Sequence, residues 1–165
     1  DEIFDSDLRE LPDLPSLTEL DISYAEITDI ETLSRFTTLE SLDISWNNID
    51  DISVVSELPV LKKLFASGTN NISDISALES CERLDELVVR ENSVSSISPL
   101  SSLVEISVID LYGNEVSELN SLVENTGLGE GDIVNLGHNP IDCVEQMVNI
   151  NALQERGVEI ITGCQ

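Results

Sequence analysis

A sequence pattern that returns about every 22 residues constrains the fold of this chain more than any other feature. Five units are clear, and they begin at Ser16, Thr38, Val60, Arg83 and Glu105. A sixth, degenerate unit contains the segment IVNLGHNPI from Ile133 to Ile141, and the spacing widens once to 23 and once to 25 residues. A unit of this length cannot bury its own apolar side chains, so the repetition predicts that successive units stack and bury one another.

Apolar residues occupy the same positions in each unit. Those of the second unit recur in the fourth, where Leu39, Leu42, Ile44, Ile49, Ile52, Val55 and Leu58 become Leu84, Leu87, Val89, Val94, Ile97, Leu100 and Leu103. The alternation from Leu42 to Ile44 is typical of a β-strand with one buried face. The second half of the unit advances in steps of three, which predicts a 3₁₀ or single helical turn on the opposite side. We therefore expect about six parallel strands.

Asparagine follows the expected strand in five units, at Asn47, Asn70, Asn92, Asn114 and Asn139. A buried amide at this turn can bond to backbone groups of the neighbouring unit that would otherwise lack partners. The first unit has Ala25 in this column, so we expect its turn to be looser or closer to solvent.

The combined pattern L-x-x-L-x-L-x-x-N-x-I-x-D-I resembles the leucine-rich-repeat family, in particular the short 22-residue class of listerial internalins and many bacterial surface proteins. The resemblance extends from about Leu8 to Cys164. It implies an α/β solenoid, a curved array with a parallel sheet on the concave side and 3₁₀ or helical turns on the convex side. Adhesins, receptors and cytosolic scaffolds share such solenoids, so the resemblance specifies the fold more closely than the function.

The two ends of the array are expected to differ from its centre. Residues 1–15 align with part of a repeat and predict an abbreviated N-terminal cap, in which Ile3 and Phe4 are candidates to cover the first turn. Its brevity is consistent with a preceding segment outside this sequence. Residues 16–142 form the repeats, and residues 143–165 are expected to form a C-terminal cap of one helix and one strand. Met147 is expected to lie in the core of this cap, which resembles the cap of many bacterial secreted leucine-rich-repeat proteins.

The three cysteines have different expected environments. Cys81 occupies the column of Phe36 and Leu58 and is best explained as a small buried apolar residue. Cys143 and Cys164 flank the cap and are candidates for a disulfide, which would contribute roughly 3 kcal/mol and would place the protein outside the cytoplasm. Two free thiols remain the alternative.

The net charge of -26, from 33 acidic and 7 basic residues, excludes some classes of partner. Acids spread along the whole chain repel nucleic acid and anionic membranes. No apolar run is long enough for a membrane span. We expect a monomer that binds a protein, with a glycan as a second possibility.

The sequence offers no constellation for catalysis, so an enzyme is not expected. His138 is the single histidine and lies beside the asparagine column, and neither a phosphate-binding glycine loop nor a metal-ligand cluster is present. Asp29, Asp51 and Asp74 align one unit apart, where capping of a turn is favoured over calcium binding. No cofactor is predicted.

Alignment of the strands identifies the side chains that face outward from the concave sheet. The expected partner-binding residues are apolar, aromatic or basic: Tyr24, Trp46, Lys63, Phe65, Val88, Arg90, Val108 and Tyr112. Lys63 and Arg90 are expected to orient an acidic or polar partner, although Phe65 and Trp46 could simply pack against their neighbours. We therefore predict a non-enzymatic protein-binding module, secreted or on a cell surface. A cytosolic scaffold or regulatory subunit, for example of a phosphatase, is the alternative.

Overall fold

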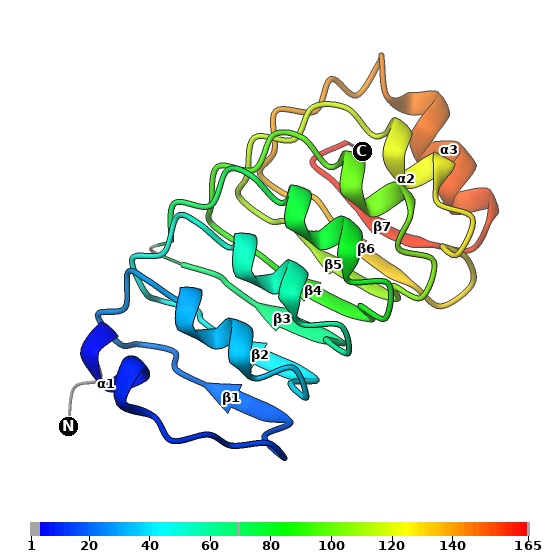
Figure 1. Cartoon of the computed structure of the whole chain (residues 1–165). Coiled ribbons are helices and arrows are strands. Elements are labelled where there is room, and N and C mark those ends of the chain that lie inside the picture. The colour runs from blue at the N-terminus through cyan, green and yellow to red at the C-terminus, as the bar shows by residue number, and fades with distance from the viewer. Residues whose placement is uncertain (1–3, 69, 165) are drawn as a thin grey trace.

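The computed structural model describes residues 4–68 and 70–164, and within them seven strands form one parallel sheet in the order of the sequence. The strands are β1 (Glu19–Asp21), β2 (Ser41–Asp43), β3 (Lys63–Phe65), β4 (Glu86–Val88), β5 (Val108–Asp110), β6 (Ile133–Asn135) and β7 (Glu159–Ile161). Leu42 pairs with Leu20 on one side and Leu64 on the other, so equivalent residues of successive units lie in register. The solenoid expected from the repeat is confirmed (Figure 1).

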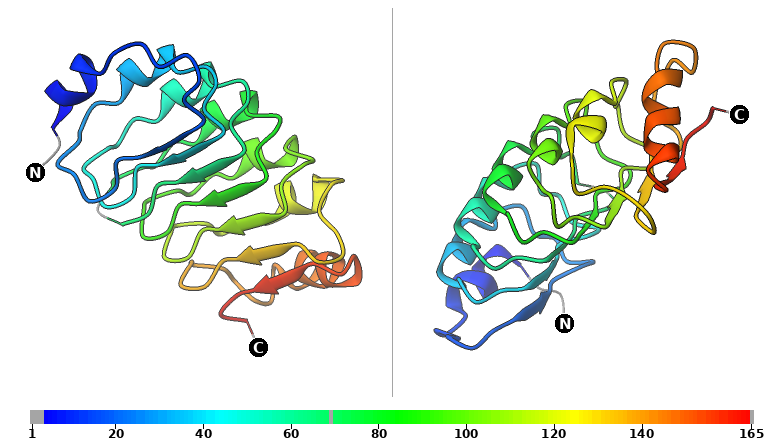
Figure 2. Two further views of the ribbon diagram at one scale, coloured as in Figure 1. Left: turned by 90° about the horizontal axis from the view of Figure 1, so that it is seen from below. Right: turned by 90° about the vertical axis from the view of Figure 1, so that its right-hand side faces the viewer.

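Short helices run along the side opposite the sheet (Figure 2). They are the 3₁₀ helices η1 (Glu31–Arg35), η2 (Ser53–Glu57), η3 (Ser76–Ser80) and η4 (Ser98–Ser101), followed by the α-helix α2 (Asn120–Glu124). The carboxylates of Asp29, Asp51 and Asp74 each accept the backbone N–H two residues later, at 2.9, 2.8 and 2.8 Å. Their expected capping role is confirmed, and these hydrogen bonds hold the pKa values of Asp29 and Asp74 below the ordinary range.

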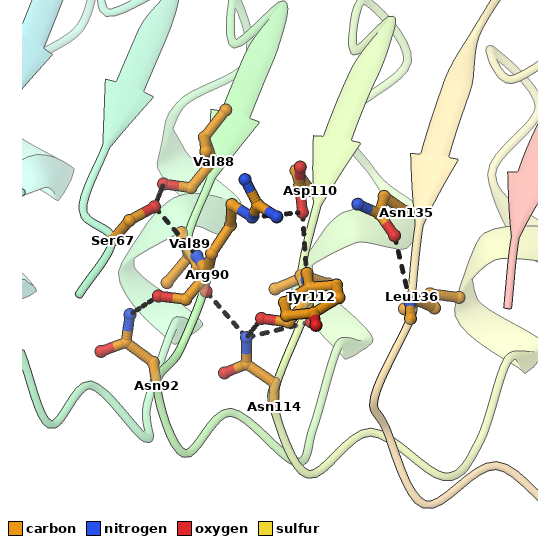
Figure 3. Close-up of polar contacts among 12 residues, drawn as sticks. Ser67, Val88, Val89, Arg90, Asn92, Asp110, Tyr112, Asn114, Asn135 and Leu136 are labelled. Carbon is orange, nitrogen blue, oxygen red and sulfur yellow. Dashed lines mark hydrogen bonds and ion pairs between the residues drawn. The ribbon is translucent and has the colours of Figure 1, made fainter. Parts of the chain in front are cut away.

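The asparagine column forms a ladder of hydrogen bonds between adjacent units. The Asn114 amide donates to the Val89 carbonyl at 2.7 Å, and its oxygen accepts the Val94 N–H at 2.9 Å (Figure 3). The first unit receives equivalent bonds from Asn47, and Ala25 is itself buried. The turn nevertheless lies closer to solvent than that of the second unit, as expected, because Tyr24 is 76% exposed against 44% for Trp46, and Ala25 is 8% exposed against 3% for Asn47.

Asn125 is a buried asparagine that the repeat does not identify. Its amide donates to the carbonyls of Leu100 and Leu103 at 2.7 and 2.9 Å, and its oxygen accepts the Gly127 N–H at 2.7 Å. These hydrogen bonds satisfy backbone carbonyl and N–H groups in and beside the fifth unit, which is the longest of the five.

The helix α1 (Asp5–Glu10) packs beside η1 at the N-terminal end of the array. The Asp5 carboxylate accepts the N–H and hydroxyl of Thr28 at 2.9 and 2.7 Å, which fastens α1 to the first unit. Leu8, within α1, is buried, whereas Phe4 is 41% exposed and does not cover the first turn. Ile3, the other residue expected there, lies outside the described residues.

The C-terminal end of the array carries α3 (Met147–Glu155) and β7. The expectation that Met147 lies in the core is wrong, because it is 42% exposed. The Gln146 side chain takes the inward position instead, where its oxygen accepts the Leu119 N–H at 3.2 Å. Ile150 and Leu153 then supply the buried side of the helix.

Cys143 and Cys164 form a disulfide that joins the turn before α3 to the residues after β7, with Cα atoms 5.3 Å apart. Cys81 is a free, buried thiol, and burial raises its pKa to about 11. A thiol protonated at neutral pH and shielded from solvent is unreactive, in agreement with the packing role expected for Cys81.

Candidate functional site

The register of the sheet sets the neighbours of the outward-facing residues. Phe65 lies between Asp43 and Val88 and is half-buried. In the adjacent row Lys63 lies beside Glu86, and Val108 follows Glu86 on the next strand. These positions form the floor of the concave face.

Each unit turns away from the sheet through a residue with positive φ. Glycine takes this position at Gly68 and Gly113, with φ of 97° and 70°. Residues with a Cβ take it at Tyr24, Trp46, Glu91 and His138, with φ of 55°, 58°, 56° and 59°. A left-handed conformation costs such residues roughly 1–2 kcal/mol relative to the usual regions. Four side chains are thus held where glycine would be less strained, and strain of this kind points to a role for the side chains themselves.

Tyr24 and Trp46 form an exposed aromatic pair at this edge of the sheet. Their rings are 5.6 Å apart and nearly parallel, with an interplanar angle of 11°. Tyr24 is 76% exposed and Trp46 is 44% exposed. The other neighbour of the indole is Gly68, where an added Cβ would lie 2.6 Å from Trp46 Cδ2. Glycine at position 68 therefore permits both the positive φ of this turn and the close approach of the indole ring.

A cavity of about 490 Å³ opens beside this pair, and we call it the aromatic groove. It is lined by Ser23, Tyr24, Asp43, Ser45, Trp46, Ser67, Gly68, Val88, Arg90 and Glu91. Four of the expected partner-binding residues line it, and the other four, Lys63, Phe65, Val108 and Tyr112, do not. The groove residues that the prediction did not include are Ser23, Asp43, Ser45, Ser67, Gly68 and Glu91. Each aligns with an apolar, aromatic or basic residue that was predicted in another unit, and this alignment could have identified them.

The convex side has its own depressions, which recur with the repeat. One of about 420 Å³ includes Asp29 and Asp51, and a similar one of about 350 Å³ includes Asp51 and Asp74. Because turn-capping aspartates of adjacent units line both, these depressions follow from the geometry of the units.

Arg90 connects the groove to a second group of side chains. Its Nε lies 3.6 Å from Asp110 Oδ1, and its guanidinium carbon lies 4.9 Å from the centre of the Tyr112 ring (Figure 3). The Tyr112 ring in turn lies 4.7 Å from that of His138. Arg90 thus holds Asp110 and Tyr112 in place. Its positive charge interacts with the Asp110 carboxylate and with the face of the Tyr112 ring.

Lys63 is also paired with an acid. Its Nζ lies 2.9 Å from Glu86 Oε2, and this hydrogen bond raises the pKa of the lysine above its usual value. Lys63 and Arg90 each contact a carboxylate of the neighbouring strand, and their role in orienting an acidic or polar partner stays a prediction.

Comparison with known proteins gives the same family as the geometry. A sequence model described as "Leucine Rich repeat" matches residues 13–30 and 37–56. The chain superposes on the internalin InlF from Listeria monocytogenes str. 4b F2365 with a TM-score of 0.81, at 25% identity, over 92% of this chain and 43% of InlF. The chain has a leucine-rich-repeat fold and is similar to internalins. Proteins with this fold are typically protein-binding modules and typically not enzymes.

Other leucine-rich-repeat proteins share the fold. The protein LIC12759 from Leptospira interrogans has a TM-score of 0.77 at 21% identity, covering 87% of this chain and 36% of its own. The plant peptide hormone receptor RGFR1, solved in complex with RGF2, has a TM-score of 0.70 at 22% identity, covering 90% of this chain and 25% of its own. This chain thus spans less than half the length of each. A search of curated protein sequences gives no significant match.

Two further observations concern membranes and metals. Across residues 4–68 and 70–164, no helix has the length and apolar character needed to cross a membrane. The same residues contain no group of three or more His, Cys, Asp or Glu side chains arranged to hold a metal ion.

Proposed function

We propose that this leucine-rich-repeat module is secreted or displayed on a cell surface and binds a protein partner through its concave side, centred on the aromatic groove. The observation that carries the proposal is the exposed Tyr24–Trp46 pair, held at left-handed backbone positions beside the groove.

The chemistry of the groove supports a protein contact. Tyrosine, tryptophan and arginine are the residues that most often supply binding energy at protein interfaces. Tyr24, Trp46 and Arg90 all line the groove, and Val88 adds an apolar surface to it. The related fold of RGFR1 is known in complex with the peptide RGF2, which supports a polypeptide as the class of ligand.

The disulfide supports a location outside the cytoplasm. A bond between Cys143 and Cys164 persists in oxidising compartments, whereas cytosolic thiols are kept reduced. The partner is then expected among extracellular or cell-surface proteins.

A displayed library of random peptides tests the proposal even though the partner is unidentified. Peptides selected on the oxidised protein are measured again on Tyr24→Ala and Trp46→Ala, with Glu57→Ala in η2 as the control on the convex side. Loss of an interface anchor costs about 1 kcal/mol or more, so we expect affinity to fall about fivefold or more for the groove variants alone.

Circular dichroism and urea unfolding of each variant establish that the fold is retained. Phe65→Ala shows in addition whether the contact continues along the sheet beyond the groove. Equal affinity for all variants, or losses confined to Glu57→Ala, would contradict the concave side as the binding surface.

A further inference from the structure

The basic residues of this acidic protein are almost all engaged within it. Arg9, Lys62, Lys63 and Arg90 pair with Asp29, Glu40, Glu86 and Asp110, while Arg35 and Arg156 donate to backbone carbonyls. Arg83, the seventh, borders a convex depression together with Glu79, Glu82 and Glu105. The described residues thus contain four ion pairs, against 33 acidic residues in the chain, so most carboxylates lack a cation of the protein itself.

The aromatic groove shows the same excess of acidic over basic side chains that are free of an ion pair. Arg90 directs its guanidinium toward Asp110 and Tyr112 on the C-terminal side (Figure 3). Asp43 and Glu91 are the acidic residues that line the groove, and the Glu91 carboxylate is turned toward Gly113, beside which an added Cβ would lie 3.0 Å from Glu91 Cδ. Asp43 Oδ1 accepts the Ser45 N–H at 2.9 Å, and no ion pair of the described residues includes Asp43 or Glu91.

We propose that the aromatic groove binds a basic segment of a protein partner, with an Arg or Lys side chain placed near Tyr24 and Trp46 and beside the carboxylate of Asp43, while Glu91 adds negative charge at the far end of the groove. The proposal rests on the proposed function and specifies the chemistry of the ligand. It reverses the expectation, based on Lys63 and Arg90, that the partner is acidic.

Three physical effects favour a cation here. Aromatic faces attract Arg and Lys through the ring quadrupole, and Tyr24 is largely exposed. The Asp43 carboxylate in the groove, with Glu91 at its far end, complements a positive charge. The net charge of -26 adds a long-range attraction, which clefts concentrate and which repels an acidic segment.

Trp46 provides the measurement, because it is the only tryptophan of the chain and its emission reports on the groove alone. The probes are three capped Gly-Ser peptides that carry two arginines, two citrullines or two glutamates at the same positions. We expect the arginine peptide to change Trp46 emission saturably, the citrulline peptide to bind more weakly, and the glutamate peptide to have no effect. Added sodium chloride should weaken binding of the arginine peptide, since exposed charges are screened.

Matched variants separate the groove from the general charge of the protein. Asp43→Asn with Glu91→Gln removes two charges at the groove, and Glu57→Gln with Glu79→Gln removes two on the convex side, in η2 and η3. Exposed ion pairs contribute about 0.2–1 kcal/mol, so the groove pair should weaken binding by up to about fivefold for each carboxylate. The convex pair should leave the affinity nearly unchanged.

Equal losses for the two double variants would overturn the proposal, as would equal binding of the citrulline or glutamate peptide. An arginine peptide that leaves Trp46 emission unchanged would also overturn it. The proposed function can survive the failure of this inference. If library-selected peptides depend on Trp46 but carry no basic residue, the concave side remains the binding surface and only its preference for cations is contradicted.

Discussion

Replacement of Asn47 by alanine tests the asparagine ladder that joins adjacent units. Asn47 is 3% exposed. Its oxygen accepts the Ile27 N–H at 3.0 Å, and its amide donates to the carbonyls of Ile22 and Ile44 at 2.9 and 3.0 Å. The amide also donates to the Ser45 carbonyl at 3.3 Å. Alanine keeps the Cβ and removes these side-chain bonds, so the variant isolates the amide.

The expected loss follows from the backbone groups left without a partner. The Ile44 carbonyl keeps a bond from Asn70 at 3.0 Å, whereas no other residue described by the structure bonds to the Ile27 N–H or the Ile22 carbonyl. A buried polar group without a partner costs about 1–3 kcal/mol. Two such groups, partly relieved by water in the vacated space, should lower the free energy of unfolding by about 2–4 kcal/mol and the Tm by roughly 5–15 °C.

Urea and thermal unfolding followed by circular dichroism measure this loss. Asn48→Ala is the matched control, because Asn48 is exposed and bonds to the Ile27 carbonyl only through its backbone N–H. A change below about 0.5 kcal/mol is expected for the control, as for ordinary surface substitutions. If Asn47→Ala and Asn48→Ala are equally stable, the ladder does not stabilise the stack in the way described.

Three other perturbations test the core, the cap and the N-terminal anchor. Leu87→Ala should lower the free energy of unfolding by about 2–5 kcal/mol, and a loss under about 0.5 kcal/mol in urea unfolding would mean that the register is wrong. Cys143→Ser should cost roughly 3 kcal/mol in urea unfolding. In the unsubstituted protein, alkylation after denaturation without reduction should label Cys81 alone, and labelling of all three thiols would refute the bond. Burial opposes ionisation of Asp5, but hydrogen bonds from the first unit outweigh it and lower its pKa, so its stabilisation is present above the unfolded pKa and lost as pH falls through the lower folded value. Asp5→Asn should therefore flatten the acid limb of the stability curve, and an Asp5 titration midpoint at or above the ordinary value of about 3.9 would contradict this.

The sheet and its register could be predicted from the sequence because apolar positions repeat at the unit spacing. Leu64 can lie only beside Leu42 and Leu87 if every unit buries the same set of side chains. The asparagine ladder follows for the same reason, since one column of amides meets one column of backbone groups.

The ends of the array could not be predicted with the same accuracy, because no neighbouring unit fixes the phase of their side chains. Apolar residues three apart in the cap placed Met147 in the core, yet the turn before α3 buries Gln146 in its place. Nothing in the repeat specifies α1, which Asp5 fastens to Thr28 through bonds between segments 23 residues apart.

The candidate site was predictable only in part. The strand register predicts which side chains share the concave face, and it places Lys63 beside Glu86. The shape of the groove depends on the left-handed turn at Trp46 and on the room that Gly68 leaves for the indole ring. The direction of Arg90 depends on its rotamer, since Asp110 and Tyr112 both attract the guanidinium away from the groove.

The central claim is that the concave aromatic groove binds a protein ligand, and amide and indole N–H chemical shifts test it most directly. A library-selected peptide is titrated into the ¹⁵N-labelled protein, in which the single indole N–H signal belongs to Trp46. The account predicts saturable changes at the Trp46 indole and at the amides of Val88 and Arg90, with Glu57 and Glu79 unchanged. Changes confined to the convex side, with the Trp46 indole signal unmoved at saturation, would contradict it.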